Sequence, residues 1–276
     1  MNIRPADHKD RAAISAFLNS GVYFQSHLDW IPTLDLLGEQ PFVILEDHAE
    51  IQAVLACPPD PPEIAWVRLF ASSYQLRPFF AWNALMPIAQ EKLTHQGIQI
   101  AVLCLQEWMD SILAGGNFRQ IHSVVLLEHT CMIGKDIPLP PGFELHPMAE
   151  TDIFSANVVD RAAFEPPWYA SARSTEYGFH ACVYKTVIVT KGQVVAYLYS
   201  TLADRHAHLA RLAVLPDFQR NHLGYYLVKD MLSHFLGLGI VHISVNTQSI
   251  NLRSLALYDQ LGFEVVDKGF PVYVYP

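Results

Sequence analysis

The sequence predicts a mixed α/β fold made of two tandem domains of one type. Three observations support this: 51% of the 276 residues are hydrophobic, a Pro- and Gly-rich segment at residues 132–144 lies near the midpoint, and the same order of strands and helices occurs on both sides of it. So large an apolar fraction excludes a disordered or fibrous chain. A chain of this length suits two domains of roughly 140 residues each.

The internal repeat is visible from the start of each half. NIRPADHKDRAAISAFLN and ELHPMAETDIFSANVVD each indicate a strand, a Pro turn and an amphipathic helix, and Pro5 and Pro147 are 142 residues apart. FVILEDHAEIQAVLA and TVIVTKGQVVAYLYS each indicate two strands joined by a charged turn. We therefore expect duplicated domains at 1–134 and 143–276, joined by a linker at 135–142. A chance likeness of strand–helix rhythms is the alternative.

The second half gives the clearer order of elements. Apolar alternation predicts a hairpin over 186–199 and a strand over 206–215. An apolar stripe predicts a helix over 223–236, followed by a strand over 240–247 and a helix over 252–261 that Gly262 closes. A final strand pair, containing Val265 and Val266 and the tail FPVYVYP, completes this domain.

Composition restricts the class of partner. The formal net charge is −9, so the surface repels a phosphate backbone; nucleic acid is not expected, and cationic amines are favoured. The four cysteines contain no C-x-x-C pair, which indicates buried thiols rather than a zinc site or disulfides. The N-terminus has no apolar leader, and the longest apolar runs have strand length. We expect a cytoplasmic protein without a membrane partner.

Two stretches carry the chemistry. LARLAVLPDFQRNHLGYYLVKDML ends a strand, turns and enters a helix, so unpaired backbone N–H groups and the positive helix end point to one place. Such a place binds anions, diphosphates especially. NLRSLALYDQLGFE puts Asn251 at a helix start and Tyr258 two turns further along the same face.

Together these stretches resemble the GNAT (general N-acetyltransferase) superfamily, which moves an acyl group from coenzyme A to an amine. The family's pyrophosphate loop, Gln/Arg-x-x-Gly-x-Gly/Ala, aligns with residues 219–224, where His222 takes the place of the first glycine. The second family block, N-x-x-(A/S)-x-x-x-Y-x-x-x-G-F, is matched by Asn251, Ser254, Tyr258, Gly262 and Phe263. The resemblance covers residues 143–276.

The first half resembles the same fold without its chemistry. At the loop position it has SSYQLRPFFAWN, which contains no glycine, and Pro78 lacks an N–H that could bind phosphate. Leu113 falls near the position of Tyr258. We interpret residues 1–134 as a degenerate GNAT-like copy; the alternative is that they bind a different ligand.

The resemblance implies an acetyl-CoA-dependent N-acyltransferase that needs no metal. It implies that Tyr258, with an ordinary pKa of about 10, protonates the departing thiolate, although a packing tyrosine is the alternative. His208 is the candidate base. Alternatively, His206 and His208 lie on a solvated strand edge, or they bind a metal, although no third ligand lies nearby in the sequence. A chain of water molecules could equally act as the base. The acyl oxygen would be held by a backbone N–H near Leu212 to Val214. The expected cofactor-binding residues are Leu212, Ala213, Val214, Gln219, Arg220, Asn221, His222, Leu223, Gly224, Tyr225, Asn251 and Ser254.

The acceptor is expected to be a primary amine of a small molecule or a peptide, bound by a monomer or a homodimer. The aromatic, Pro-broken segment 163–179 corresponds to the acceptor region of the family. Its aromatic side chains would form a wall, and Glu165 or Glu176 would pair with an ammonium. The wall residues are Trp168, Tyr169, Tyr177 and Phe179. Packing of this segment against the first half is the alternative. Two other functions compete: a catalytically idle CoA-binding or regulatory module, and a dimerising scaffold without a ligand.

Overall fold

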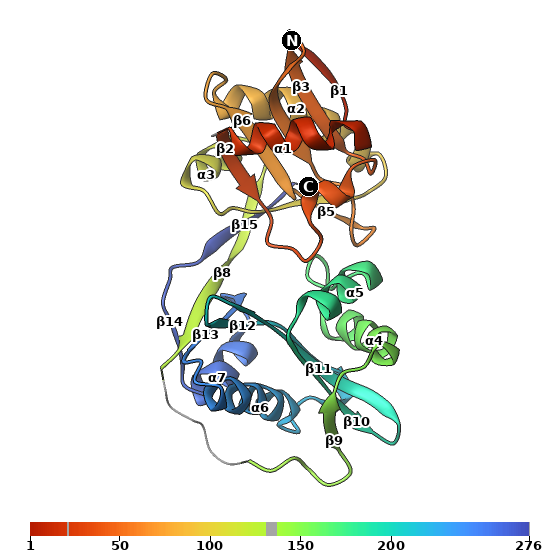
Figure 1. Ribbon diagram of the computed structural model, residues 1–276, viewed down its shortest axis with the longest axis vertical. Helices are drawn as coiled ribbons and strands as arrows, with labels where there is room; N and C mark the ends of the chain where they lie inside the picture. The colour runs from red at the N-terminus through yellow and green to blue at the C-terminus, as the bar shows by residue number, and fades with distance from the viewer. Residues whose placement is uncertain (21, 131–136, 276) are drawn as a thin grey trace. The chain divides into compact units, whose positions relative to one another are not determined.

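The structure is a computed structural model that describes residues 1–20, 22–130 and 137–275 (Figure 1). Cys131 and the first two residues of the expected linker, 135 and 136, lie outside the described residues. Contacts divide the chain into two units, Met1–His122 together with the chain from Phe270 onward, and Ser123–Gly269. The boundary between the units is therefore not at the expected linker. The first unit includes the chain from Phe270 onward, and the second unit begins at Ser123, before the linker.

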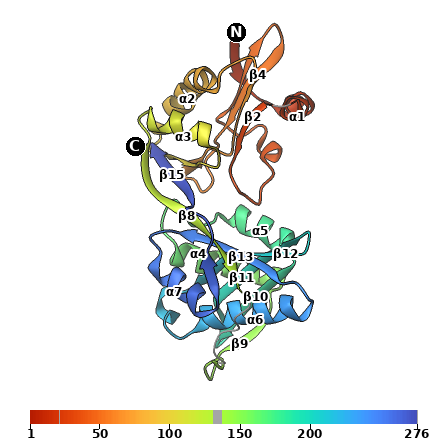
Figure 2. The same cartoon turned by 90° about the vertical axis from the view of Figure 1, so that its left-hand side faces the viewer.

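The first unit contains a five-stranded antiparallel sheet in the order β1-β3-β4-β6-β2. In chain order its elements are β1 Asn2–Pro5, α1 Arg11–Asn19, β2 Val22–Ser26, β3 Phe42–Asp47, β4 Glu50–Ala56, β5 Ile64–Trp66, β6 Leu69–Ser73, α2 Pro78–Thr94, β7 Gln99–Leu103, α3 Glu107–Ala114 and the start of β8 Arg119–His129. The last strand, β15 Phe270–Tyr275, pairs antiparallel with β7 in this unit. Figure 2 shows α2, α3 and β15 together.

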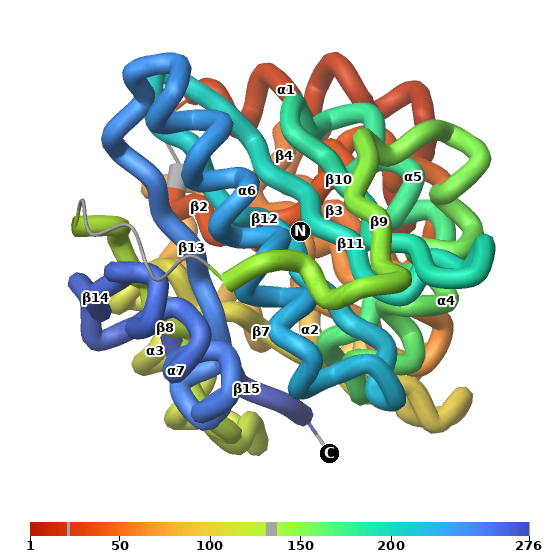
Figure 3. Tube along the Cα trace, turned by 90° about the horizontal axis from the view of Figure 1, so that it is seen from below, coloured from red at the N-terminus to blue at the C-terminus, as the bar shows by residue number. Residues whose placement is uncertain are grey.

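The second unit is a mixed sheet in the order β8-β13-β12-β11-β10-β9, with β14 also pairing with β8. Its elements are β9 Glu144–Pro147, α4 Ile153–Ala163, α5 Ala172–Ala181, β10 Tyr184–Thr190, β11 Gln193–Ala203, β12 His206–Val214, α6 Leu223–Gly237, β13 His242–Gln248, α7 Leu252–Gln260 and β14 Phe263–Val265. Strands β12 and β13 are parallel. The tube in Figure 3 follows the chain from β10 and β11 through β12 into α6.

The two faces of this sheet are covered by different helices. Ala196 and Leu198 of β11 lie in one apolar cluster with Leu227 and Phe235 of α6. The tyrosines that alternate with them point to the other face, because the Tyr197 hydroxyl donates to a residue of α4 and the Tyr199 hydroxyl donates to a residue of α5. Helices α4 and α5 therefore cover one face of the sheet, and α6 covers the opposite face.

The structure confirms most of the expected elements and corrects one. The duplicated order is present, since β1-α1-β3-β4-β6-α2-β7-α3 in the first half matches β9-α4-β10-β11-β12-α6-β13-α7 in the second. The expected final strand pair is wrong: β14 pairs with β8, and β15 pairs with β7. At the point where the chain leaves the second unit, Gly269 has φ +88, and a Cβ there would lie 2.6 Å from the Val124 carbonyl oxygen.

Cys57, Cys104 and Cys182 are free, buried thiols, and burial raises the pKa of each. Within the described residues, the structure contains no cluster of three or more His, Cys, Asp or Glu side chains that could hold a metal ion. In the same part of the chain, no helix is both long and apolar enough to cross a membrane.

Candidate active site

A gap between two parallel strands forms the centre of the candidate site. Strands β12 and β13 pair only from His206 opposite His242 to Leu209 opposite Val245. Beyond this point β12 stays paired with β11 as far as Val214. The separation begins at a β-bulge, because Tyr199 lies opposite Arg211 and Ser200 lies opposite Leu209, which leaves one extra residue in β12. From the bulge onward, the side of β12 that faced β13 is unpaired with that strand.

Backbone groups of β12 point into this gap. The N–H of Leu215 donates to the Val195 carbonyl of β11 at 2.8 Å. Since backbone groups alternate in direction along a strand, those of Ala213 face β11, while those of Leu212 and Val214 face the gap. The Val214 carbonyl confirms this direction because it accepts from Nε2 of Gln219, outside the sheet, at 3.2 Å. Fixed donors and acceptors thus line one side of the gap.

The turn between β12 and α6 has the backbone geometry of an anion site. Arg220 and His222 have φ +67 and +59, and this alternation of left-handed residues turns successive N–H groups the same way. His222 adopts the left-handed conformation although it is not a glycine. The first helical bond of α6 runs from Tyr226 N–H to the His222 carbonyl at 2.9 Å, so the N–H groups of Leu223 and Gly224 have no helical acceptor. Asn221 donates from Nδ2 to the Phe218 carbonyl and fixes the turn.

Gly224 keeps the space between β12 and α7 open. Its backbone is helical, so the need for a glycine does not come from a positive φ. A Cβ on this residue would lie 3.4 Å from Cδ2 of Leu257 on α7 and 3.8 Å from side-chain carbons of both Leu212 and Val214. A larger side chain would therefore enter the region beside the unpaired end of β12.

Side-chain hydrogen bonds at its N-terminus fix the position of helix α7. The Asn251 side chain caps the helix, since its Oδ1 accepts from the N–H of Ser254 at 3.1 Å. The Gln219 side chain links the turn to this helix, because its Oε1 accepts from Nη1 of Arg253 at 3.3 Å. In this structure Asn251 and Ser254 position α7, and Tyr258 follows on the same helix.

Tyr258 is a buried tyrosine that keeps its proton. Its side chain is 5% exposed, and its ring packs edge-on against Phe263 with the ring centroids 5.7 Å apart. Burial raises the pKa of the phenol well above 10, and the smaller effect of the Arg211 charge opposes this rise. The hydroxyl therefore carries its proton at neutral pH, as a general acid for a thiolate requires.

The two histidines of β12 share one serine. Nδ1 of His208 lies 2.8 Å from Oγ of Ser244, and Nε2 of His206 lies 2.9 Å from the same oxygen. Burial, and to a smaller extent His206, lowers the pKa of His208 to about 4. His208 is neutral at pH 7 and is a weaker base than an ordinary histidine.

Asp160 and Arg211 form a buried ion pair beside the site, and neither residue is among those predicted from the sequence. Asp160 on α4 is fully buried and accepts from Nε of Arg211 at 2.7 Å and from its Nη2 at 2.8 Å. The same carboxylate accepts from the Tyr197 hydroxyl at 2.6 Å and from the Ala170 N–H at 2.6 Å. Arg211 also donates to the Trp168 carbonyl at 2.6 Å. The available signal in the sequence was a charge inside the apolar strand LARLAV, directly before Leu212.

The acceptor segment is partly helical. Its second part forms α5, Ala172–Ala181, instead of a continuous loop. Tyr169 is buried and its ring lies under the Arg161 guanidinium at 5.0 Å, whereas Glu165 and Glu176 are exposed. Trp168 is held through its carbonyl by Arg211. The Asp160–Arg211 ion pair therefore anchors the aromatic part of this segment to β12.

Comparison with known proteins agrees with this geometry. Residues 151–263 match the acetyltransferase (GNAT) family. The [ribosomal protein bS18]-alanine N-acetyltransferase of Salmonella typhimurium is 27% identical over 117 residues, 42% of this chain and 77% of that protein. The enzyme of the same name from Escherichia coli K12 is 25% identical over 113 residues, 41% of this chain and 75% of that protein.

Solved structures show the fold of the whole chain. A tandem GNAT protein from the clavulanic acid biosynthesis pathway superposes with a TM-score of 0.65 at 14% identity, covering 99% of this chain and 97% of that one. A GCN5-related N-acetyltransferase from Sphaerobacter thermophilus gives 0.61 at 10% identity, covering 99% and 94%. The expected fold class, two tandem GNAT-like α/β domains, is confirmed.

Proposed function

Because the second half of the chain carries an acetyltransferase domain of the GNAT family, we propose that it transfers the acetyl group of acetyl-CoA to a primary amine of a small molecule or a peptide. The observation that carries this proposal is the gap between β12 and β13, which opens at a bulge and meets the first turn of α6. One strand edge and one helix end then offer backbone donors to a single elongated, anionic molecule.

The donor is held mainly by backbone. The N–H groups of Leu223 and Gly224, with the left-handed turn at Arg220 and His222, receive the diphosphate. The gap-facing groups of Leu212 and Val214 receive the amide-containing arm, and Gln219 leaves the Val214 carbonyl to admit it. Tyr225, Asn221, Asn251 and Ser254 shape the turn and α7 around these groups.

Acetyl transfer forms one bond and breaks another. The neutral amine nitrogen attacks the thioester carbon, the carbonyl oxygen gains negative charge beside the backbone N–H of Leu212 or Val214, and the C–S bond then breaks. The sulfur takes the proton of the Tyr258 hydroxyl, which is protonated at neutral pH because burial raises its pKa. The amine gives its proton to His208 as the C–N bond forms, and the Tyr258 phenolate regains a proton from water before the next turnover.

His208 is suited to pass a proton on and not to keep it. With a pKa of about 4, a protonated His208 releases its proton readily at pH 7. The Ser244 hydroxyl touches both His208 and His206, and the His206 side chain is exposed. We assign the base role to His208, with Ser244 and His206 passing the proton to water.

A peptide α-amine is supported as one acceptor by the names of the two relatives, which acetylate an alanine of a ribosomal protein. The Asp160–Arg211 pair would fix the Trp168 segment as a wall for either acceptor class. The negative charge of the protein favours the approach of a cationic amine.

A Tyr258→Phe variant tests this mechanism. Acetyl-CoA at 100 times its Kd should stabilise both proteins by about 2.7 kcal/mol in a thermal-shift assay. Acetyl transfer to peptide and small amines, followed by mass spectrometry, should fall by about 10² to 10⁴ in Tyr258→Phe. Tyr74→Phe, at an exposed tyrosine of the first unit, is the control and should keep its activity. Turnover of Tyr258→Phe within about twofold of the parent would remove Tyr258 from the acid role.

A further inference from the structure

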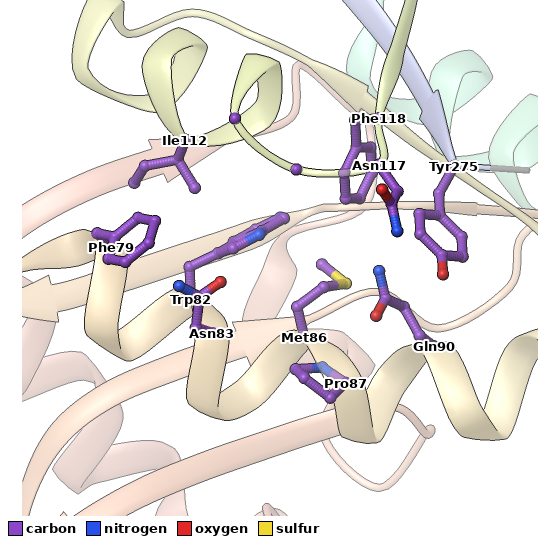
Figure 4. A pocket seen from close by; sticks show the side chains of 12 residues that line it. Phe79, Trp82, Asn83, Met86, Pro87, Gln90, Ile112, Asn117, Phe118 and Tyr275 are labelled. Atoms are coloured by element: carbon purple, nitrogen blue, oxygen red, sulfur yellow. The ribbon is translucent and has the colours of Figure 1, made fainter.

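A pocket of about 340 Å³ lies within the first unit, and none of its lining residues belongs to the proposed active site. It opens between one side of α2, the turn that joins α3 to β8, and the end of β15 (Figure 4). Its volume is near the lower end of the range for small-molecule sites, so it suits a ligand of one or two rings.

The walls of this pocket are aromatic and uncharged. Trp82 and Phe118 form its buried part, and Phe79, which is 52% exposed, stands at its rim. No Lys, Arg, His, Asp or Glu is among the described residues that line it. A charged ligand would therefore lose hydration without gaining a counter-charge, whereas a flat neutral ring can pack against the aromatic side chains.

Polar groups of one kind converge on the same space. Three carboxamides line the pocket, those of Asn83, Gln90 and Asn117, and the structure shows no hydrogen bond from their side chains to other described residues. Figure 4 shows the amide groups of Gln90 and Asn117 turned toward one another, with the Tyr275 hydroxyl beside them. A carboxamide both donates and accepts, so it pairs best with a group that also does both.

The helix adds a backbone acceptor at this wall. Pro87 lies inside α2 and has no N–H, so the carbonyl of Asn83, four residues earlier, lacks its helical donor. Both residues line the pocket. An N–H group of a bound molecule can take the place of the missing donor.

From these observations we propose that the first unit binds a small neutral planar ring that carries an amide or amide-like edge, such as an aromatic primary amide or a nucleobase. The ring lies against Trp82 and Phe118, and its edge exchanges hydrogen bonds with Gln90, Asn117 and the Asn83 carbonyl. None of its lining residues is among those proposed to act in acetyl transfer.

Nicotinamide and nicotinate form a matched pair of probes, since they share a ring and differ in amide against carboxylate. The full chain labelled at the methionine methyls reports binding, because Met86 lines the pocket while Met231 lies on α6 of the second unit. Nicotinamide should shift the Met86 signal and leave Met231 unmoved, and nicotinate should bind about tenfold more weakly, the ratio expected for about 1.4 kcal/mol. A Met86→Leu variant assigns the signal.

Variants then test the carboxamides. Gln90→Ala and Asn117→Ala should each weaken nicotinamide binding at least fivefold, while Gln96→Ala, an exposed carboxamide beyond the end of α2, should change nothing. Gln90→Lys should raise nicotinate affinity to the level of nicotinamide. This result would show that nicotinate binds weakly because the pocket has no positive charge, and not because the whole protein is negatively charged. The proposal is overturned if Met86 does not respond to nicotinamide or adenine up to their solubility limits. It is also overturned if nicotinate binds as well as nicotinamide, or if neither alanine variant weakens binding.

Discussion

Replacing Asp160 by Asn should destabilise the second unit strongly while keeping the shape of the side chain. The carboxylate is fully buried and accepts four hydrogen bonds, two at each oxygen. Asparagine replaces one oxygen by an NH₂ group, so two donors lose their acceptor whichever way the amide turns. In addition, the Arg211 guanidinium keeps its charge in a site that no longer neutralises it.

The magnitude follows from burial. Removing one partner of a buried ion pair typically costs about 3 to 5 kcal/mol. The Arg211 side chain is 21% exposed, and because of this partial hydration we expect a loss of about 3 kcal/mol. Against a total stability of about 5 to 15 kcal/mol this is a large fraction, and it corresponds to a fall in Tm of about 6 to 12 °C.

Urea unfolding followed by circular dichroism measures this loss. Asp217→Asn is the control, because Asp217 is an exposed carboxylate in the turn before α6. A second change, Asp160→Asn with Arg211→Met, should recover part of the loss because it removes the uncompensated charge. A free energy of unfolding for Asp160→Asn within about 1 kcal/mol of the parent would refute the account of this cluster.

Three further changes test other parts of the account. Gly269→Ala should destabilise by about 1 to 3 kcal/mol in urea unfolding, more than Gly192→Ala, since both glycines have positive φ but only the first has a carbonyl oxygen 2.6 Å from its Cβ position; equal losses would contradict the close approach. The lowered pKa of His208, about 4 instead of 6.5, means that the folded state binds fewer protons between these values, so stability falls as pH drops from 6.5 to 4. His208→Gln should reduce this slope, and an unchanged slope would show that burial does not shift this histidine. A fragment of residues 123–269 should be more soluble than one of 143–276, because only the former contains the β8 segment that covers the edge of β13; the reverse order of solubility would contradict the strand assignment.

Local pattern was enough to predict much of the second unit. The hairpin β10–β11, helix α6 and helix α7 all follow from alternation, an apolar stripe and a closing glycine. The positions of the turn at residues 219–225 and of Tyr258 follow from the same short-range signals. These features depend on residues within about one helix length of each other.

Long-range partners could not be obtained in this way. Nothing in FPVYVYP indicates that β15 pairs with β7, because the apolar residues of a strand do not specify which strand it pairs with. Asp160 and Arg211 are 51 residues apart, and a charged residue on an amphipathic helix is normally solvated, so their pairing depends on the fold.

Calorimetric titration of the full chain with acetyl-CoA tests the central claim most directly. The account predicts one site per chain, since the turn at residues 219–225, which we propose binds the diphosphate, has no counterpart in the SSYQLRPFFAWN segment. Gly224→Val should abolish or greatly weaken binding, because its side chain would enter the space beside Leu212 and Val214, while Gly237→Val, at the open end of the same helix, should bind as the parent does. Two sites per chain, no binding by the parent, or undiminished binding by Gly224→Val would contradict it.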